Sequence, residues 1–184
     1  QQVSIVLLVG GGDGIGPLKP VVQAVAAQHP AAHLVVIAGR NAELRRELCA
    51  LETQVPLLRV EGFVSNMEVW MRAADLLVSK AGPNTLSEAF ITGCPIIIYS
   101  AIPGQETGNV AYVIKHNAGL WAPSPAATAQ AIIELLTHPA RRHAMADNSR
   151  ALARPQAAVT IAQSLWNLSQ AQSTPYAGRW VSTP

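Results

Sequence analysis

A strand, a glycine–proline turn and a helix follow one another in the middle of the chain, and this succession constrains the fold most. Residues 73–78 form a mostly apolar run, of the kind that makes a strand buried on both faces. The chain breaks at residues 81–83 (Ala-Gly-Pro), and apolar side chains then recur at helical spacing over residues 86–93. The sequence therefore predicts a helix that begins directly after the end of a buried strand.

The predicted helix carries a carboxylate, Glu88, one turn inside its N-terminus. A helix N-terminus has unpaired backbone N–H groups and a partial positive charge, so it can hold a phosphate, and an acid one turn further in can accept hydrogen bonds from ribose hydroxyls. The same residues also fit a capping box, in which Glu88 turns back to the N–H of Thr85 and binds no ligand. Both interpretations stay open on this stretch alone.

A glycine-rich loop follows the first predicted strand. Residues 3–9 are almost continuously apolar, residues 10–17 read GGGDGIGP, and apolar residues then return at helical spacing. Glycines let the backbone approach a diphosphate closely, as in the phosphate loops of parallel βαβ units. No register gives G-x-G-x-x-G, and residues 38–40 (Ala-Gly-Arg) supply no acid after the second strand, which disfavours NAD. A glycine-rich turn without a ligand remains the alternative.

A polar loop leaves another buried strand, predicted at residues 96–99. Its side chains Gln105, Glu106 and Asn109 precede a helix predicted at residues 110–116, and they can donate to and accept from the hydroxyls of a sugar. The alternative is a solvated turn in which Asn109 is the N-cap. Because parallel strands end at one edge of their sheet, the glycine loop, the helix N-terminus and this loop should converge there, where open α/β sheets bind ligands.

The remaining segments complete a Rossmann-like α/β fold, with a parallel sheet of about six strands and helices on both faces. Further strands are predicted at residues 33–38, 56–60 and 120–121, and further helices at residues 42–51, 66–71, 125–137, 140–150 and about 155–168. Trp70 is interpreted as a core residue. The last helix has an apolar stripe, and the polar residues 169–184 predict a flexible tail, so residues 1–168 are the expected domain.

The composition disfavours several classes of function. Charged residues make up 13% of the chain and the net charge is +2, without a long run of like charge, which argues against a nucleic-acid partner. The apolar runs are far shorter than the ~20 residues that span a bilayer, so we expect a cytoplasmic protein or one peripheral on the cytoplasmic membrane face. Cys49 and Cys94 lack CxxC spacing and the five histidines lack ligand spacing, which predicts reduced cysteines and no metal. A first residue other than Met suggests that the chain is part of a longer protein.

Five motifs resemble the C-terminal, donor-binding half of a GT-B glycosyltransferase, over roughly residues 6–137. They are GGGDGIGP at 10–17, AGRN at 38–41, EGFVSNM at 61–67, SKAGPNTLSEA at 79–89 and PGQETGNVAYV at 103–113. The chain is similar to the branch that holds monogalactosyldiacylglycerol synthases and bacterial diacylglycerol glucosyltransferases, and more distantly to the peptidoglycan lipid-linked N-acetylglucosaminyltransferase. The donor of this family is a UDP-hexose, which is a substrate, and the resemblance implies no cofactor.

The resemblance implies a role for each motif. The donor phosphates are expected at Gly11, Gly12, Asp13, Gly14, Ala81, Gly82, Pro83, Asn84 and Thr85. Uridine is expected at Phe63, Val64 and Glu88, where the backbone of the first two residues would contact uracil and Glu88 would hold the ribose. The donor sugar is expected at Gln105, Glu106 and Asn109.

The implied activity is the transfer of galactose or glucose from UDP to a diacylglycerol-type lipid. In this family an N-terminal domain carries the acceptor site, the membrane-binding surface and the expected catalytic base. The chain lacks that domain, so we expect it to bind the donor without transferring sugar by itself. The alternatives are a nucleotide-sugar-binding subunit that needs a separate acceptor-binding partner chain and, third, a UDP-sugar epimerase of the same fold. The sequence leaves the hexose, the acceptor and the catalytic residues open.

Overall fold

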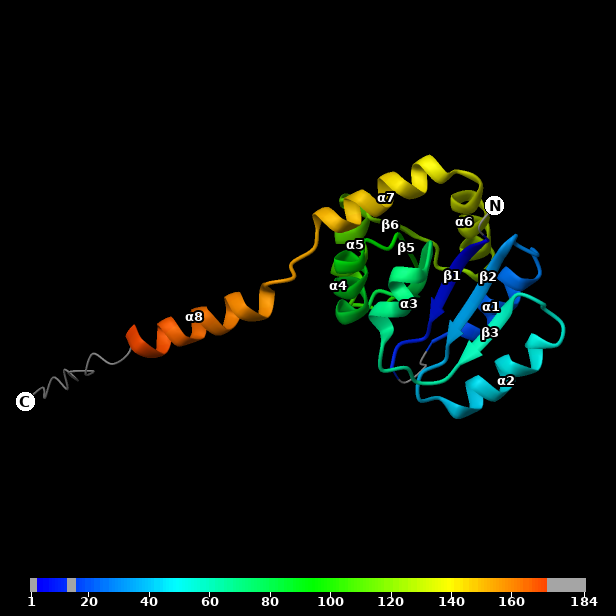
Figure 1. The fold of residues 1–184 in the computed structure, drawn as a ribbon, viewed down its shortest axis with the longest axis horizontal. Helices are drawn as coiled ribbons and strands as arrows, with labels where there is room; N and C mark the ends of the chain where they lie inside the picture. Colours follow the sequence, from blue (N-terminus) through cyan, green and yellow to red (C-terminus); the bar gives the residue numbers. More distant parts are fainter. Residues whose placement is uncertain (1–2, 13–15, 172–184) are drawn as a thin grey trace, which may run out of the picture. The chain divides into compact units, whose positions relative to one another are not determined.

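The computed structural model contains one parallel sheet of six strands, in the order β3-β2-β1-β4-β5-β6 (Figure 1). It describes residues 3–12 and 16–171. The strands are β1 (Ser4–Val9), β2 (Ala32–Ile37), β3 (Leu58–Glu61), β4 (Leu76–Lys80), β5 (Ile96–Ser100) and β6 (Gly119–Trp121). The predicted Rossmann-like fold is confirmed.

Helices alternate with the strands until β6, and three helices then follow in succession. The helices are α1 (Leu18–Ala26), α2 (Ala42–Glu52), α3 (Met67–Ala73), α4 (Pro83–Thr92), α5 (Thr107–Lys115), α6 (Pro125–Thr137), α7 (Pro139–Ala151) and α8 (Ala157–Ala171). Most predicted bounds agree with these to within two residues. α5 differs more, because it begins at Thr107 instead of residue 110.

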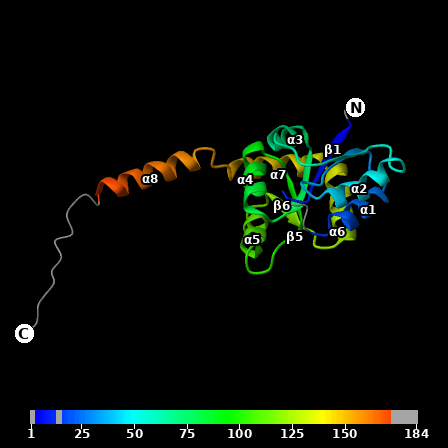
Figure 2. The same ribbon diagram turned by 90° about the horizontal axis from the view of Figure 1, so that it is seen from below.

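The four inner strands, β2, β1, β4 and β5, bury side chains on both of their faces, in two apolar cores. In β1, Val6 and Leu8 enter the core formed with α1, α2 and α6, whereas Leu7 and Val9 enter the core formed with α3, α4 and α5. Figure 2 shows the two sets of helices on opposite sides of the sheet. Burial on both faces explains why these strands are continuous apolar runs in the sequence.

The start of β4 is the main correction to the predicted strands. The sequence predicts this strand from residue 73, but α3 extends to Ala73 and β4 begins at Leu76. Between them, Asp75 turns toward β1: its N–H donates to Ile5 O at 2.8 Å, and its Oδ2 accepts from Ile5 N at 2.9 Å. Its Oδ1 also lies 3.5 Å from a guanidinium nitrogen of Arg142. These polar contacts hold Asp75 at the amino-terminal edge of the sheet, outside the strand.

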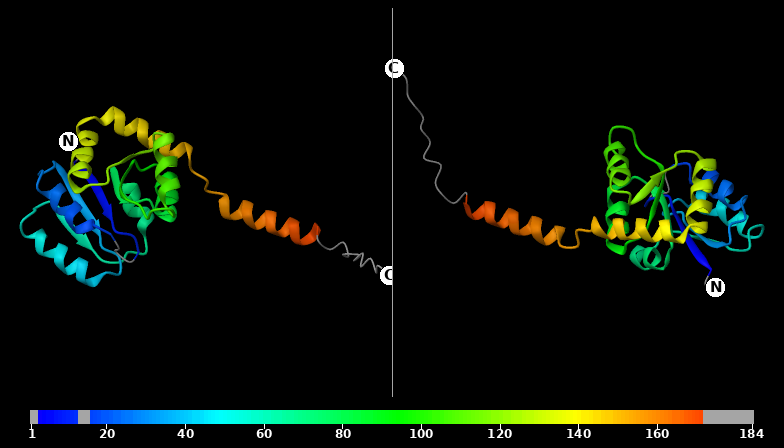
Figure 3. Two further views of the ribbon diagram at one scale, coloured as in Figure 1. Left: turned by 180° about the vertical axis from the view of Figure 1, so that it is seen from behind. Right: turned by 90° about the horizontal axis from the view of Figure 1, so that it is seen from above.

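The chain divides into two compact units, Gln1–Ala153 and Arg154–Pro184. In the first, α7 contacts both α6 and α4, which Figure 3 shows from two sides. The buried Ser149 hydroxyl donates to the carbonyls of Ala89 and Cys94, which connects α7 to the end of α4. The second unit contains α8, whose large apolar side chains are 60% to 63% exposed.

The domain boundary near residue 168 stays a prediction. Residues 169–171, which the sequence assigns to the tail, belong to α8, and the rest of the expected tail, 172–184, lies outside the described residues. No helix in the described part of the chain has both the length and the apolar character needed to cross a bilayer.

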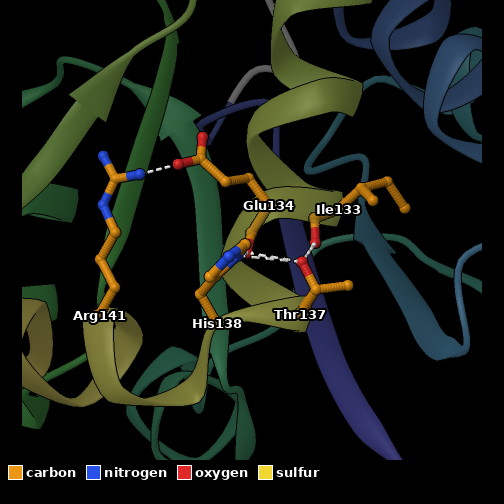
Figure 4. A network of polar contacts seen from close by, with 5 residues as sticks. All are labelled: Ile133, Glu134, Thr137, His138 and Arg141. Carbon is orange, nitrogen blue, oxygen red and sulfur yellow. Dashed lines mark hydrogen bonds and ion pairs between the residues drawn. The ribbon is translucent and has the colours of Figure 1, made fainter.

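Polar contacts close the turn between α6 and α7 (Figure 4). The Thr137 hydroxyl donates to the carbonyls of Ile133 and Glu134 at 2.9 and 3.0 Å, and His138 Nδ1 lies 2.8 Å from the same Glu134 carbonyl. The Glu134 carboxylate also pairs with Arg141 of α7. These contacts satisfy groups at the end of α6 where the chain turns into Pro139.

A substitution at Gly39 tests how tightly the glycine loop packs against the turn after β2. Its φ is +67°, and a Cβ at this position would lie 2.6 Å from the carbonyl oxygens of Gly11 and Gly12. Gly39→Ala should therefore lower the free energy of unfolding by more than the roughly 1–2 kcal/mol that a left-handed backbone costs an L-residue. The matched control is Gly104→Ala, since Gly104 has φ +79° and nothing within 4 Å of its Cβ position. Urea unfolding measures both, and equal losses would show that the loop moves aside without cost.

Candidate functional site

Two adjoining cavities open at the carboxyl edge of the sheet, where the strand-end loops converge as predicted. The smaller, of about 220 Å³, is here called the Lys80 cavity, and the larger, of about 320 Å³, the Phe63 cavity. The Lys80 cavity is lined by Gly11, Gly12, Ser79, Lys80, Gly82, Pro83, Asn84, Thr85 and Glu106. The Phe63 cavity is lined by Val9, Gly11, Gly12, Ile37, Gly39, Phe63, Val64, Met67, Asn84, Thr85 and Glu88. The glycine loop and the first turn of α4 are common to both.

A larger cavity of about 590 Å³ lies elsewhere, between α1 and α6. Half of its lining residues are alanines, and neither the glycine loop nor the N-terminus of α4 contributes to it. Volume alone would favour this groove. We assign the site to the two smaller cavities because polar and charged groups from several strand ends converge there.

The N-terminus of α4 borders both cavities. Its N-cap is Gly82, Pro83 occupies the first helical position, and no side chain caps the helix. The first intrahelical bond runs from Leu86 N–H to Gly82 O at 3.1 Å, so the N–H groups of Asn84 and Thr85 precede the helical ladder. This turn therefore presents backbone donors and the positive end of a helix dipole to the cavities.

Glu88 lines the Phe63 cavity from the second turn of α4. The capping-box interpretation is wrong, because it requires Thr85 as the N-cap, whereas the N-cap of α4 is Gly82, three residues earlier. Partial burial raises the pKa of the Glu88 carboxyl, and the neighbouring Glu68 carboxylate raises it further. Glu88 therefore supplies a hydrogen-bond acceptor to the Phe63 cavity. Its burial and the Glu68 charge both disfavour the ionised form of the carboxyl.

Phe63 and Val64 line the Phe63 cavity together with residues of the first two turns of α4. The Phe63 ring is 55% exposed, and the Arg40 Cζ lies 4.2 Å from its centroid. Val64 packs against the core on the α3, α4 and α5 face. Trp70, predicted as a core residue, also packs there and lines neither cavity.

The glycine loop is held by the turn after β2. Arg40 N–H donates to Gly12 O at 2.9 Å, and the backbone of Gly39 lies too close to the loop for any side chain. Gly11 and Gly12, which the sequence predicts to contact phosphates, line both cavities. Asp13 and Gly14, also predicted to contact phosphates, lie outside the described residues.

Lys80 is a candidate residue that the sequence analysis did not identify. It is the last residue of β4, half-buried, and its Cε lies 3.7 Å from the position of a Cβ on Gly11. It makes no ion pair with any residue in the described ranges, although it lines a cavity. A lysine at the end of a buried strand, two residues before a Gly-Pro turn, was the available signal.

The loop after β5 contributes less to the cavities than the sequence predicts. Glu106 lines the Lys80 cavity and is 5% exposed, with its Oε2 accepting from Ile102 N–H at 2.8 Å. Gln105 is exposed, and neither Gln105 nor Asn109 is a lining residue. Asn109 instead donates through Nδ2 to Ala81 O at 2.9 Å. The N-cap alternative for Asn109 is wrong, because Glu106 is the N-cap of α5.

No group of three or more His, Cys, Asp or Glu side chains within residues 3–12 and 16–171 could hold a metal ion. Cys49 and Cys94 are free thiols. Burial raises the pKa of the Cys94 thiol to about 12, with a further contribution from the nearby Asp75 carboxylate. Among the described residues, the charged side chains that line the two cavities are Lys80, Glu88 and Glu106, and the polar side chains of Ser79, Asn84 and Thr85 line them as well.

Comparison with known proteins identifies the family. The model of the glycosyltransferase family 28 C-terminal domain matches residues 5–163. The chain is 39% identical over 178 residues to monogalactosyldiacylglycerol synthase 2, chloroplastic, of Arabidopsis thaliana, covering 92% of this chain but 38% of that protein. It is 36% identical over 173 residues to the monogalactosyldiacylglycerol synthase of Spinacia oleracea, covering 90% of this chain and 33% of that protein. The chain thus spans about a third of the length of these relatives.

A solved structure supports the fold. MurG of Acinetobacter baumannii superposes with a TM-score of 0.69 at 20% identity, over 92% of this chain and 50% of that one. Because the identity is low, this likeness concerns the arrangement of the strands and helices alone. The family model matches most of this chain, and the two synthases are more than a third identical to it. This chain therefore belongs to the glycosyltransferase family 28 C-terminal domain family.

Proposed function

We propose that this chain is the donor-binding part of a hexosyltransferase that moves galactose or glucose from a UDP-hexose to a diacylglycerol-type lipid. The observation that carries the proposal is the pair of adjoining cavities, with a lysine and backbone donors at one end and an acid beside an aromatic wall at the other. The named activity of the synthase relatives in Arabidopsis and spinach supports the choice of sugar and acceptor.

The Lys80 cavity suits the diphosphate. Lys80 supplies a positive charge, the first turn of α4 supplies N–H groups, and Gly11 and Gly12 leave room for phosphate oxygens. Negative charge develops on UDP as its bond to the sugar breaks, and these donors lie where they would stabilise the departing group. The proposed contribution of this chain to the reaction is therefore donor positioning and stabilisation of the leaving group.

The Phe63 cavity suits the nucleoside. Glu88 can accept from ribose hydroxyls, and the backbone at Phe63 and Val64 can contact the edge of uracil. Gly11, Gly12, Asn84 and Thr85 lie where the two cavities meet, at the proposed junction of ribose and diphosphate.

The acceptor and its catalytic base are proposed to come from outside residues 1–184. No histidine lines either cavity in the described part of the chain, and the matched family model is that of a C-terminal domain. The proposed lipid acceptor would bring the working enzyme to a membrane surface.

Binding of UDP should stabilise the chain measurably. At ~100 times its dissociation constant, UDP contributes about 2.7 kcal/mol to the free energy of unfolding, which corresponds to a rise of roughly 5–10 °C in melting temperature. UDP-galactose or UDP-glucose should do the same, and NAD should shift the melting temperature much less. Differential scanning calorimetry compares them, and a larger shift with NAD would overturn the proposal.

The affinity for UDP should depend on pH through Glu88. The ionised carboxylate is the form that accepts from ribose, and its raised pKa means that affinity falls as the pH is lowered, beginning above the usual range for a glutamate. Titration calorimetry of the wild type and Glu88→Gln across pH isolates this effect, because the phosphates of UDP titrate equally with both. Glu68→Gln should shift the loss of affinity to lower pH, since it removes one cause of the raised pKa. A pH profile unchanged by Glu88→Gln would remove Glu88 from the site.

Replacing Lys80 should weaken UDP binding strongly and uridine binding little. Lys80→Ala removes a charge-assisted contact to phosphate, which should cost about 1.5–3 kcal/mol of binding free energy. Lys115→Ala is the matched control, because it changes the net charge equally at the opposite end of α5 from the cavities. Equal effects of the two variants on the dissociation constant would mean that Lys80 acts only through overall charge.

A further inference from the structure

One side-chain contact joins the two loops that border the Lys80 cavity. Asn109, in the first turn of α5, donates from Nδ2 to the carbonyl of Ala81, 28 residues earlier in the chain, at 2.9 Å. Ala81 is fully buried and lies directly before Gly82, the N-cap of α4. The contact therefore reaches from the loop after β5 to the turn after β4.

The Ala81 carbonyl depends on this contact for its hydrogen bond. It precedes the N-cap of α4, so it lies outside the hydrogen-bond ladder of that helix. The N–H of Ala81 is already used, since it donates to Ser100 O at 2.9 Å. Without the Asn109 amide, a partly buried carbonyl would lose its protein donor, and such groups are almost always paired in folded proteins.

The same peptide plane carries the Gly82 N–H. In a trans peptide the C=O and N–H bonds point in opposite directions, so an interaction that orients the Ala81 carbonyl also orients the Gly82 N–H. Gly82 lines the Lys80 cavity, and its N–H makes no hydrogen bond to another described residue. The orientation of this donor is thus set from α5.

The Glu106 carboxylate also lies close to the turn before α4. Its Oε2 is occupied by the N–H of Ile102, while its Oε1 lies 3.8 Å from the position of a Cβ on Gly82. Residues 102–109, here called the α5 loop, and residues 81–85, here called the α4 turn, therefore meet at Gly82 as well as at Ala81.

We propose that Asn109 is a positioning residue that orients the diphosphate-binding amides of the α4 turn and couples that turn to the α5 loop. It does so without touching the donor sugar. The inference rests on the proposed function, because it names the diphosphate of UDP as the group that the oriented amides bind. The sequence resemblance implies that Asn109 contacts the donor sugar. In the role proposed here, Asn109 acts through its hydrogen bond to the Ala81 carbonyl instead.

The affinities of Asn109→Ala for a series of ligands test this role. The variant should bind UDP roughly tenfold more weakly and UDP-galactose or UDP-glucose more weakly by the same factor, while its affinity for uridine stays unchanged. A residue that contacted the sugar would instead lower the affinity for the UDP-hexose and leave that for UDP as in the wild type. That pattern, or an unchanged affinity for all ligands, would overturn the inference.

Two further variants make the comparison specific. Asn148→Ala is the matched control, because its side-chain amide also donates to a backbone carbonyl, that of Asn117 at 3.2 Å, and it lines neither cavity, so it should leave the affinity for UDP unchanged. Asn109→Asp keeps the size of the side chain but places an acceptor oxygen against the Ala81 carbonyl, so it should weaken UDP at least as much as Asn109→Ala. Thermal unfolding monitors the fold of each variant. Alanine favours a helix, so the first turn of α5 should persist in Asn109→Ala.

A measurement without ligand separates failure of this inference from failure of the proposed function. In the ligand-free chain, Asn109→Ala should change the amide resonance of Gly82 and lower its order parameter, while Gly62, in a loop that Asn109 does not contact, keeps its wild-type values. An unchanged Gly82 resonance overturns the positioning role even if UDP binds the wild type. A changed resonance in a chain that does not bind UDP supports the coupling of the two segments and sinks the proposed function.

Discussion

The pairing of β1 with β4 is the interaction on which the site depends. These strands are adjacent and parallel, with Val6 opposite Leu76 and Leu8 opposite Val78, although α1, β2, α2, β3 and α3 separate them in the sequence. The strand order reverses at this pair: β2 and β3 lie on one side of it, and β5 and β6 on the other. The helices that follow β1 and β4 pack on opposite faces of the sheet, so their first turns separate and open a crevice between them. The turn after β2 and the loop after β5 reach the same crevice from either side.

The sequence predicts the sheet well because its four inner strands are buried on both faces. Such strands are uninterrupted apolar runs, and glycines and prolines mark their ends, so the loops that leave the carboxyl edge could be identified without knowing the strand order. The start of β4 could not be predicted in the same way. Ala73 and Ala74 are apolar and fit the end of a helix as well as the start of a strand. The contacts of Asp75 with Ile5 of β1 decide between them, and periodicity contains no information about that partner.

At the site, the sequence predicts which loops are involved better than it predicts what each side chain does. Glu106 and Asn109 belong to one short segment and both have hydrogen-bonding side chains, yet Glu106 lines a cavity and Asn109 turns to the carbonyl of Ala81. The difference follows from where α5 begins, because a helix starting at Thr107 places Asn109 beside the α4 turn. The sequence analysis does not identify Lys80, because its proposed role depends on the glycine loop, which β1 brings beside it from about seventy residues earlier.

The arrangement around α4 supports the proposed ligand site at its N-terminus, although most helix N-termini bind no ligand. α2 and α6 have side-chain caps, from Asn41 and Ser124, whereas α4 begins at Gly82 without one and has no acid in its first turn. Uncapped helices occur elsewhere in the chain, so the missing cap is weak evidence by itself. What distinguishes α4 is that its first turn lines a cavity together with Lys80 and two glycines. A positive charge beside unpaired N–H groups is unfavourable in an empty site, and a bound anion would satisfy both.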